Sequence, residues 1–269
     1  MNGTFDKECV RRAFSMAAGT YDSYGNLQKE VARDVVSFLK KGPGITLDAG
    51  CGTGTLAQSV REVHPSSTIY GCDFSMPMLR TAAEKLAIKK GRHVGADCES
   101  LPFKDSSFDT VVSSLAYHWV TDLPAAFYEV FRVLKPGGLF LFSTAGPETF
   151  RELRVSIEEA KRMTGKNGLP ALMGFAGKEE ILKTLEKAGF GKIRADGRRR
   201  EKYYGGLKEL LRTLKHTGAI NPMPGGDGAL SRGSLLKEAA AIYKERFSSP
   251  DGRCPATYDV ILVTAEKSL

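Results

Sequence analysis

Glycines alternate with other residues directly after a short apolar run, and this feature restricts the fold most. The run Ile45–Ala49 is typical of a buried strand, Thr55–Val63 has the pattern of a helix, and between them stand Gly50, Gly52 and Gly54. Glycine has no Cβ, so such a loop can turn sharply and let a ligand contact the main chain. The helix start would direct unpaired N–H groups and a partial positive charge at that ligand. This order of elements is typical of doubly wound α/β proteins that hold a nucleotide-like cofactor.

The spacing of the loop and the acids that follow it indicate which cofactor. A dinucleotide fingerprint would place its third glycine where Thr55 stands. A second predicted strand, Thr68–Asp73, ends in an acid placed to accept hydrogen bonds from both ribose hydroxyls. A NAD enzyme would use that acid but leave Asp97 and the turn at Lys135–Gly138 unexplained.

Five ordered elements between Leu27 and Ser143 resemble the S-adenosylmethionine-dependent methyltransferases of the Rossmann-like class. The resemblance implies a doubly wound, mostly parallel, seven-stranded α/β sheet with a helical lid. It also implies S-adenosylmethionine as cofactor and S-adenosylhomocysteine as product. The further elements that carry it are the strand Phe108–Ser114, the turn Val133–Gly138 and the strand Leu139–Phe142.

The predicted cofactor residues have distinct roles. Asp73 binds the ribose, and Asp97 with Cys98 beside it holds the adenine amino group. Asp48 orients the glycine loop. Phe74 and Met78 either pack on the adenine or belong to the core. Ser114 and Leu115 line the site, because ligands of a doubly wound sheet bind at the carboxyl ends of its strands. The full predicted set is Asp48, Gly50, Cys51, Gly52, Gly54, Asp73, Phe74, Met78, Asp97, Cys98, Ser114 and Leu115.

The pattern divides the chain into four parts. Residues 1–41 form an N-terminal lid segment with an irregular stretch from Phe14 to Tyr24 and a helix from Asn26 to Lys41. Residues 42–203 form the cofactor-binding core, with a helical excursion at about 146–176 that begins in a capping box of Thr149 and Glu152. Residues 204–249 are a helical lid insertion, and residues 250–269 supply the final strand.

Composition limits the environment and the partners. The chain has 269 residues, five scattered cysteines without a C-x-x-C pair, and four histidines at no zinc spacing, so we expect a reducing compartment and no metal. No apolar run is long enough to span a membrane, and the first residues are charged rather than apolar, which favours a cytoplasmic protein without a signal peptide.

The net charge of +8 is concentrated late in the chain. Nine basic and three acidic residues between Phe190 and Thr217 leave +6 in that segment. We interpret it either as a solvated surface or as a docking surface for an acidic partner. The residues predicted to dock are Arg198, Arg199, Arg200, Lys208, Arg212 and Lys215.

A narrower resemblance covers nearly the whole chain. It is to the malonyl-acyl-carrier-protein O-methyltransferases of biotin synthesis, whose members often have glutamine where His118 stands. The matching segments are Phe14–Asp22 with Leu27-Gln28, Leu115–Trp119, Phe142–Pro147, Leu211–Lys215 with Gly218, Ala219 and Asn221, and Thr257-Tyr258. The resemblance implies that S-adenosylmethionine methylates the free carboxylate of a malonyl thioester, an early step toward pimeloyl and biotin. Acyl carrier protein is acidic, which suits the +6 segment, but coenzyme A stays open as the thioester bearer.

The chemistry itself requires few catalytic groups. A carboxylate acceptor is ionised at neutral pH, so no general base is needed, whereas a hydroxyl acceptor would need one, and His118 is the nearby candidate. Tyr21, His118 and Trp119 are predicted around the transferred methyl and the carboxylate. Two alternatives remain: a methyltransferase of another small acid, or an RNA methyltransferase. The basic segment lacks the regular aromatic residues that stack on bases, so we expect no nucleic-acid partner.

Overall fold

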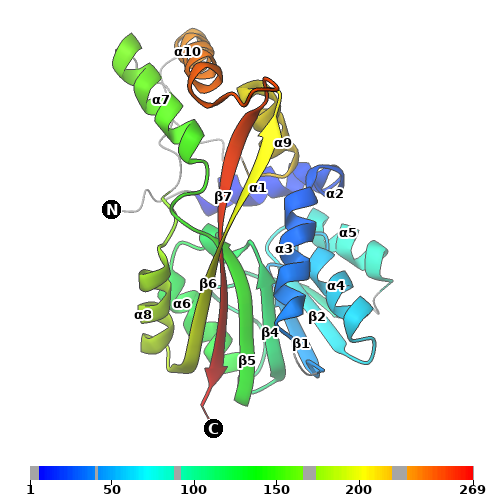
Figure 1. Ribbon diagram of the computed structural model, residues 1–269. Coiled ribbons are helices and arrows are strands. Elements are labelled where there is room, and N and C mark those ends of the chain that lie inside the picture. Colours follow the sequence, from blue (N-terminus) through cyan, green and yellow to red (C-terminus); the bar gives the residue numbers. More distant parts are fainter. Residues whose placement is uncertain (1–5, 40–41, 88–91, 166–173, 220–228, 269) are drawn as a thin grey trace.

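The sheet confirms the predicted fold class. The structure, a computed structural model, describes residues 6–39, 42–87, 92–165, 174–219 and 229–268 (Figure 1). Within these residues seven strands form one sheet in the order β3-β2-β1-β4-β5-β7-β6, parallel except that β7 runs antiparallel to both its neighbours. The strands are β1 (Ile45–Ala49), β2 (Thr68–Asp73), β3 (His93–Gly95), β4 (Phe108–Ser114), β5 (Leu134–Ala145), β6 (Phe190–Tyr204) and β7 (Cys254–Lys267).

Helices cover both faces of the sheet. The helices of the core are α3 (Asn26–Ser37), α4 (Thr55–Val63), α5 (Met76–Leu86), α6 (Leu123–Val133) and α8 (Lys178–Lys187). Val111 and Val112 follow one another in β4 and are both fully buried, but they belong to different cores. Val111 packs with apolar residues of α6 and α8, and Val112 packs with those of α3 and α4. This strand therefore has a continuous apolar run because helices cover it on both faces.

A second layer stands above the carboxyl ends of the parallel strands. Pairing of β5 with β7 ends at Val260, but β6 and β7 stay paired as far as Tyr204 and Cys254, so the two strands project beyond the sheet (Figure 1). Packed around this extension are α7 (Arg151–Thr164), α9 (Leu207–His216) and α10 (Ala229–Phe247). Leu153, Leu210 and Tyr243 lie at the centre of the resulting second core.

Three local expectations are corrected. The stretch from Phe14 is helical, because α1 (Lys7–Ala17) and α2 (Tyr21–Tyr24) occupy it; α1 begins at Asp6, whose side chain accepts the N–H of Glu8. The third helix ends at Ser37, earlier than predicted. The predicted turn at 133–138 begins at the last residue of α6, and its residues 134–138 belong to β5, where the pairing with β4 is irregular.

The predicted capping box at Thr149 and Glu152 is wrong. The N-cap of α7 is Phe150, with φ at 58° and no side-chain cap bond. Thr149 Oγ1 instead donates to the Asp259 carbonyl, and the Glu152 carboxylate accepts from both the N–H and the hydroxyl of Thr257. These side chains therefore attach α7 to β7. Their hydrogen-bond partners lie on the neighbouring strand and not at the start of the helix.

Candidate active site

The glycine loop brings bare main chain to the tips of β1 and β4. Gly50, Gly52 and Gly54 all have positive φ, between 53° and 80°. A Cβ at Gly50 would lie 2.5 Å from the Cβ of Ala116, so no other residue fits there. The N–H groups of Gly50 and Cys51 both donate to the Cys72 carbonyl at 2.9 Å, which ties the loop to the end of β2.

Asp73 stands at the end of β2, as predicted, and is only 7% exposed. Its Oδ2 accepts the N–H of Gly52 at 2.9 Å and its Oδ1 accepts the N–H of Ser75 at 2.8 Å. Burial raises the pKa of Asp73 to about 6, although the two N–H groups oppose that shift. The group is thus largely a carboxylate at neutral pH, with lone pairs left for further donors.

A small pocket of about 70 Å³ opens beside this carboxylate. Of the predicted cofactor residues it is lined by Gly50, Gly52, Asp73, Phe74, Met78, Asp97, Cys98, Ser114 and Leu115. Asp48, Cys51 and Gly54 do not line it. Asp48 Oδ2 accepts the N–H of Ala57 in the first turn of α4 at 3.1 Å, and Gly54 is the N-cap of that helix.

A large cavity of about 640 Å³ adjoins the small pocket. Its walls come from α2 and the start of α3, from the turn after β4, from α7 and α9, and from the projecting ends of β6 and β7. The small pocket and the large cavity share Phe14, Tyr21, Leu115 and Trp119. Two of these rings meet edge to face, with the centroids of Phe14 and Trp119 5.3 Å apart. A ligand in one chamber can therefore face a ligand in the other across this shared wall.

His118 faces the large cavity as a neutral ring. It lies in the 3₁₀ turn Tyr117–Trp119 after β4, and its Nδ1 accepts the N–H of Ala145 at 3.4 Å. Burial lowers the pKa of His118 to about 3. Because Nδ1 accepts a hydrogen bond, the proton of the neutral ring sits on Nε2. His118 is consequently a hydrogen-bond donor through Nε2 and a poor general base.

The large cavity is mostly apolar, and its charged wall residues are already engaged. Lys202 Nζ pairs with Glu30 at 2.6 Å, Glu209 accepts the N–H of Gly205 at 2.6 Å, and Asp259 accepts the N–H of Glu148 at 3.2 Å. Such a chamber suits an elongated ligand without a charge along its length.

Comparisons with known proteins identify the family of the chain. A sequence profile described as a methyltransferase domain matches residues 47–142. The chain is 36% identical over 260 residues to the malonyl-acyl-carrier-protein O-methyltransferase of Geobacter sulfurreducens (strain ATCC 51573 / DSM 12127 / PCA), covering 95% of this chain and 97% of that protein. The chain belongs to this methyltransferase family.

Two further matches define how far that conclusion extends. The chain is 33% identical over 269 residues to the mitochondrial arginine-hydroxylase NDUFAF5 of Danio rerio, covering 98% of this chain and 82% of that protein. The crystal structure of the YcgJ protein from Bacillus subtilis superimposes with a TM-score of 0.61 at 20% identity, covering 89% and 99% of the two chains. The YcgJ structure supports the Rossmann-like fold. The arginine-hydroxylase shows that proteins of similar sequence carry more than one activity name.

The cofactor of this methyltransferase is S-adenosylmethionine, and the residues that line the small pocket suit its groups. The pocket offers bare main chain at Gly50 and Gly52 and a buried carboxylate at Asp73 that would accept the ribose hydroxyls. Beneath the loop, Asp48 Oδ1 is buried and has no hydrogen-bond partner in the described parts of the chain, and burial raises the pKa of Asp48 to about 7. The largely ionised Asp73 suits a donor that carries a positive sulfur.

Two groups of site residues escaped the sequence analysis because both come from the N-terminal helices. Lys7 of α1 lines the small pocket and pairs with Asp97 at 2.6 Å and with Glu99 at 2.5 Å. Burial alone would lower the pKa of Lys7, but these two carboxylates outweigh it and raise the pKa. Asp97, the predicted adenine-binding acid, therefore already has a cationic partner. A single lysine in a segment that was not predicted to be helical gave no signal of this ion pair.

The second missed group fastens α2 to the glycine loop. Asp22 accepts the hydroxyl of Thr53 at 2.6 Å, and its other oxygen pairs with Lys85 of α5 at 2.5 Å. Asp22 directly follows Tyr21, so these contacts hold Tyr21 in place in the shared wall. Only an acid next to a predicted site residue could have hinted at this arrangement.

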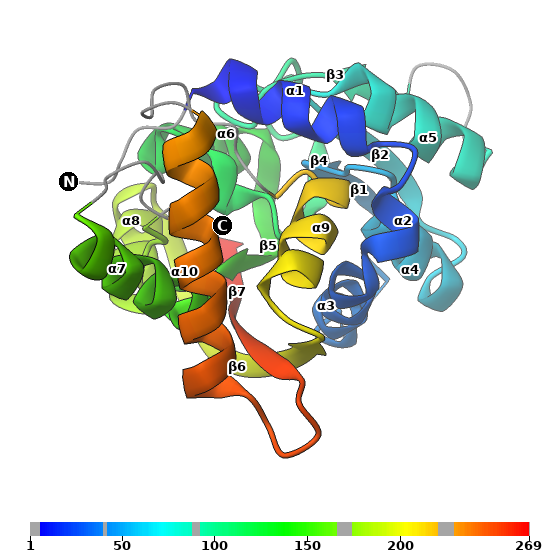
Figure 2. The same ribbon diagram turned by 90° about the horizontal axis from the view of Figure 1, so that it is seen from above.

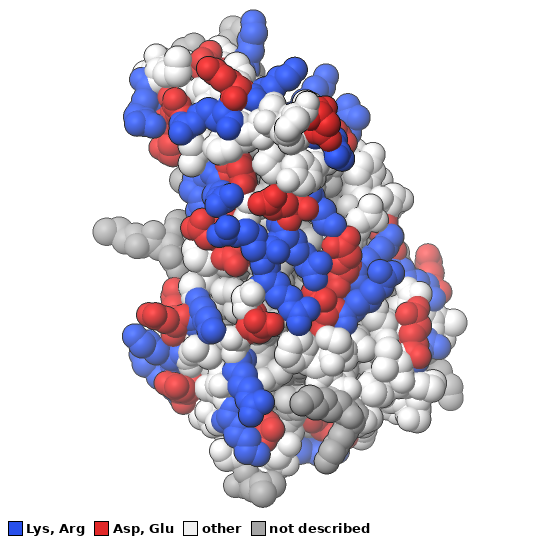
Figure 3. Space-filling model, in the orientation of Figure 1, with Lys and Arg blue, Asp and Glu red and all other residues white. Residues whose placement is uncertain are grey.

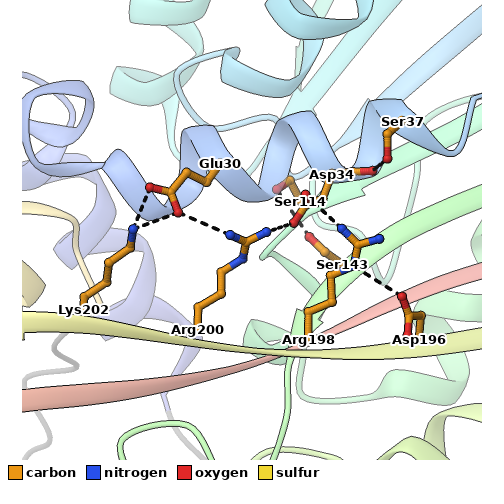
Figure 4. A network of polar contacts seen from close by, with 9 residues as sticks. All are labelled: Glu30, Asp34, Ser37, Ser114, Ser143, Asp196, Arg198, Arg200 and Lys202. Atoms are coloured by element: carbon orange, nitrogen blue, oxygen red, sulfur yellow. Dashed lines mark hydrogen bonds and ion pairs between the residues drawn. The ribbon is translucent and has the colours of Figure 1, made fainter.

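The six predicted docking residues fall into separate groups. Arg198 and Arg200 point from β6 toward α3, where both pair with Asp34 and Arg200 also pairs with Glu30 (Figure 4). Arg199, between them, is exposed, as expected from the alternation of a strand. Lys208, Arg212 and Lys215 are exposed on α9. Figure 3 shows Lys and Arg gathered over β6 in the middle of one face, with Asp and Glu directly beside them.

No described helix is long and apolar enough to cross a membrane. The same residues contain no group of three or more His, Cys, Asp and Glu side chains arranged to hold a metal ion.

Proposed function

We propose that this protein transfers a methyl group from S-adenosylmethionine to the free carboxylate of a malonyl thioester carried by acyl carrier protein. The observation that carries this proposal is the wall of Phe14, Tyr21, Leu115 and Trp119 shared by the small pocket and the large cavity. When bound, S-adenosylmethionine supplies a methyl group on a positively charged sulfur. The carbon–oxygen bond forms as the carbon–sulfur bond breaks, which leaves S-adenosylhomocysteine and a methyl ester.

The residues on the large-cavity side can orient the carboxylate without accepting a proton. A carboxylate is already ionised at neutral pH, so the reaction needs no general base. His118 presents an Nε2–H group, and burial raises the pKa of Tyr21, which keeps its hydroxyl protonated. Both are therefore donors suited to hold the nucleophilic oxygen in line with the methyl group.

The aromatic residues of the shared wall would keep water away from this oxygen. Phe14 packs between Trp119 and Phe74, with ring centroids 5.3 Å and 6.4 Å away. An anionic oxygen that is shielded from water is a stronger nucleophile because fewer solvent hydrogen bonds must be broken.

The name of the 36% identical relative supports acyl carrier protein as the thioester bearer. The engaged charges and apolar walls of the large cavity suit the arm that links a thioester to its carrier. Methylation would mask the negative end of the malonyl group, and we place this step early in pimeloyl and biotin synthesis.

The test is a methyl-transfer assay with labelled S-adenosylmethionine and four acceptors: malonyl-acyl carrier protein, malonyl-coenzyme A, free malonate and RNA. We expect a methyl ester on the malonyl thioesters, identified by mass spectrometry and by its alkaline lability. Methylation of malonate alone would identify an enzyme of free small acids. Labelling of RNA alone, or the absence of label on every acceptor, would refute the proposal.

A further inference from the structure

The helix α9 carries a stripe of cations on one face. Lys208, Arg212 and Lys215 are spaced i, i+4 and i+7, which places them on the same side of an α-helix. All three are exposed, whereas the opposite side buries Leu207, Leu210 and Leu214 in the second core. We call Lys208, Arg212 and Lys215 the α9 stripe.

The charges of the α9 stripe are available, and those of β6 are largely not. Arg198, Arg200 and Lys202 each pair with Glu30 or Asp34 of α3. Among the described residues, by contrast, no ion pair or side-chain hydrogen bond engages a cation of the α9 stripe. A charged surface attracts an oppositely charged partner only to the extent that its own neighbours do not neutralise it.

The α9 stripe also lies beside the opening of the large cavity. The exposed residues that line this cavity are Ser23, Tyr24, Asn26, Tyr203 and Glu209, so the cavity opens between the α2–α3 junction, the end of β6 and α9. His216 of α9 stacks on Tyr24 with ring centroids 4.3 Å apart, which fixes α9 at this rim. Seen from above, α9 lies between α10 on one side and α2 and α3 on the other (Figure 2).

We propose that the α9 stripe is the docking surface for an acidic helix of the carrier protein. This inference rests on the proposed function. A carrier that seats acidic side chains on Lys208, Arg212 and Lys215 would hold its thioester arm at the opening of the large cavity. Arg198, Arg200 and Lys202 of β6 do not take part, because they hold β6 against α3.

The experiment compares two charge reversals of equal size on two surface helices. Lys208→Glu/Lys215→Glu alters the α9 stripe, and the control Lys183→Glu/Lys187→Glu alters exposed lysines of α8, which packs against α6 and β6 away from the opening. Each variant is assayed with malonyl-acyl carrier protein and with malonyl-pantetheine, which bears no carrier and no phosphate.

We expect the α9 variant to raise the KM for the carrier-linked substrate by about tenfold or more. The kcat for that substrate and all constants for malonyl-pantetheine should stay unchanged, and the α8 variant should behave as the wild type. Added salt should raise the carrier KM of the wild type but hardly that of the α9 variant.

Three results would overturn the docking surface: an unchanged carrier KM in the α9 variant, an equal rise for both substrates, or an equal rise in both variants. Wild-type methylation of malonyl-acyl carrier protein reports the proposed function separately. If that activity is absent, the proposed function fails. If it is present and the carrier KM does not respond, only the docking surface fails.

Discussion

Single residues divide the work of the site by the protonation state that their surroundings impose. Burial raises the pKa of Asp73 to about 6 and lowers that of His118 to about 3, so near neutral pH one is an acceptor and the other a neutral donor. The residue types alone predicted a role for each, but not the direction of proton donation at His118. That direction follows from the N–H of Ala145, which occupies Nδ1.

Asp73→Ala should weaken cofactor binding by roughly ten- to hundredfold, since a hydrogen bond to a charged group contributes about 1.5–3 kcal/mol. Its titration gives a second signature. As pH falls through about 6, protonation removes acceptor capacity, so cofactor affinity should fall. Ribose hydroxyls that donate to the carboxylate would lower its pKa, so binding near that pH should release protons.

Calorimetry in two buffers of different ionisation enthalpy measures this release. The proton release attributable to Asp73 should disappear in Asp73→Asn, which retains an acceptor for one backbone N–H but cannot ionise. Unchanged affinity in the alanine variant would contradict the ribose role.

His118→Gln should keep most of the activity because the amide retains an N–H donor, whereas His118→Ala should lose roughly tenfold or more. The pH dependence of kcat at saturating cofactor should have the same shape in the wild type and in His118→Gln, because the histidine pKa of about 3 lies far below neutral pH. A rising limb near the ordinary histidine pKa that vanishes in the glutamine variant would instead identify a general base.

At the scale of elements, β6 packs into the apolar core at its start and is attached to α3 by charge along its middle. Exposed and half-buried residues alternate from Gly197 to Tyr204, and the half-buried cations Arg198, Arg200 and Lys202 face Glu30 and Asp34 of α3. A cluster of basic residues in the sequence predicted a surface for an outside partner. In the structure, these cations instead pair with acidic residues of the same chain. The acids belong to α3, which is distant from β6 in the sequence but lies beside it in the fold.

Arg200→Ala should destabilise the protein by about 1–2 kcal/mol, between the values of exposed and buried ion pairs, because it leaves Asp34 and Glu30 with fewer partners. Lys192→Ala is the matched control on the same strand, since its pair with Glu266 is 76% and 41% exposed; its free energy of unfolding should change by less than about 0.5 kcal/mol.

Thermal or urea unfolding monitored by circular dichroism measures both β6 variants. The carrier KM of folded Arg200→Ala should equal that of the wild type. A raised KM for the carrier-linked substrate with unchanged stability would instead show that Arg200 belongs to the docking surface.

At the scale of the whole molecule, the site is a junction of three parts of the chain. The small pocket belongs to the carboxyl ends of β1, β2 and β4, the shared wall adds Phe14 and Tyr21 from the N-terminal helices, and the large cavity is completed by α7, α9 and the projecting β6–β7 pair. Contacts such as the pairing of Lys7 with Asp97 join parts that lie far apart in the sequence. The proposed methyl transfer at this junction would therefore require the second layer as well as the sheet.

The sequence by itself determined the fold class, the glycine loop and the acid at the end of β2. Each is encoded locally: apolar runs define buried strands, and a loop that must turn with positive φ needs glycine at those positions. Only the tertiary structure decided which cations are neutralised, which rings form the shared wall and why His118 stays neutral. Those properties depend on burial and on partners from distant segments, such as the ring of Phe175 beside His118, and no local pattern records them.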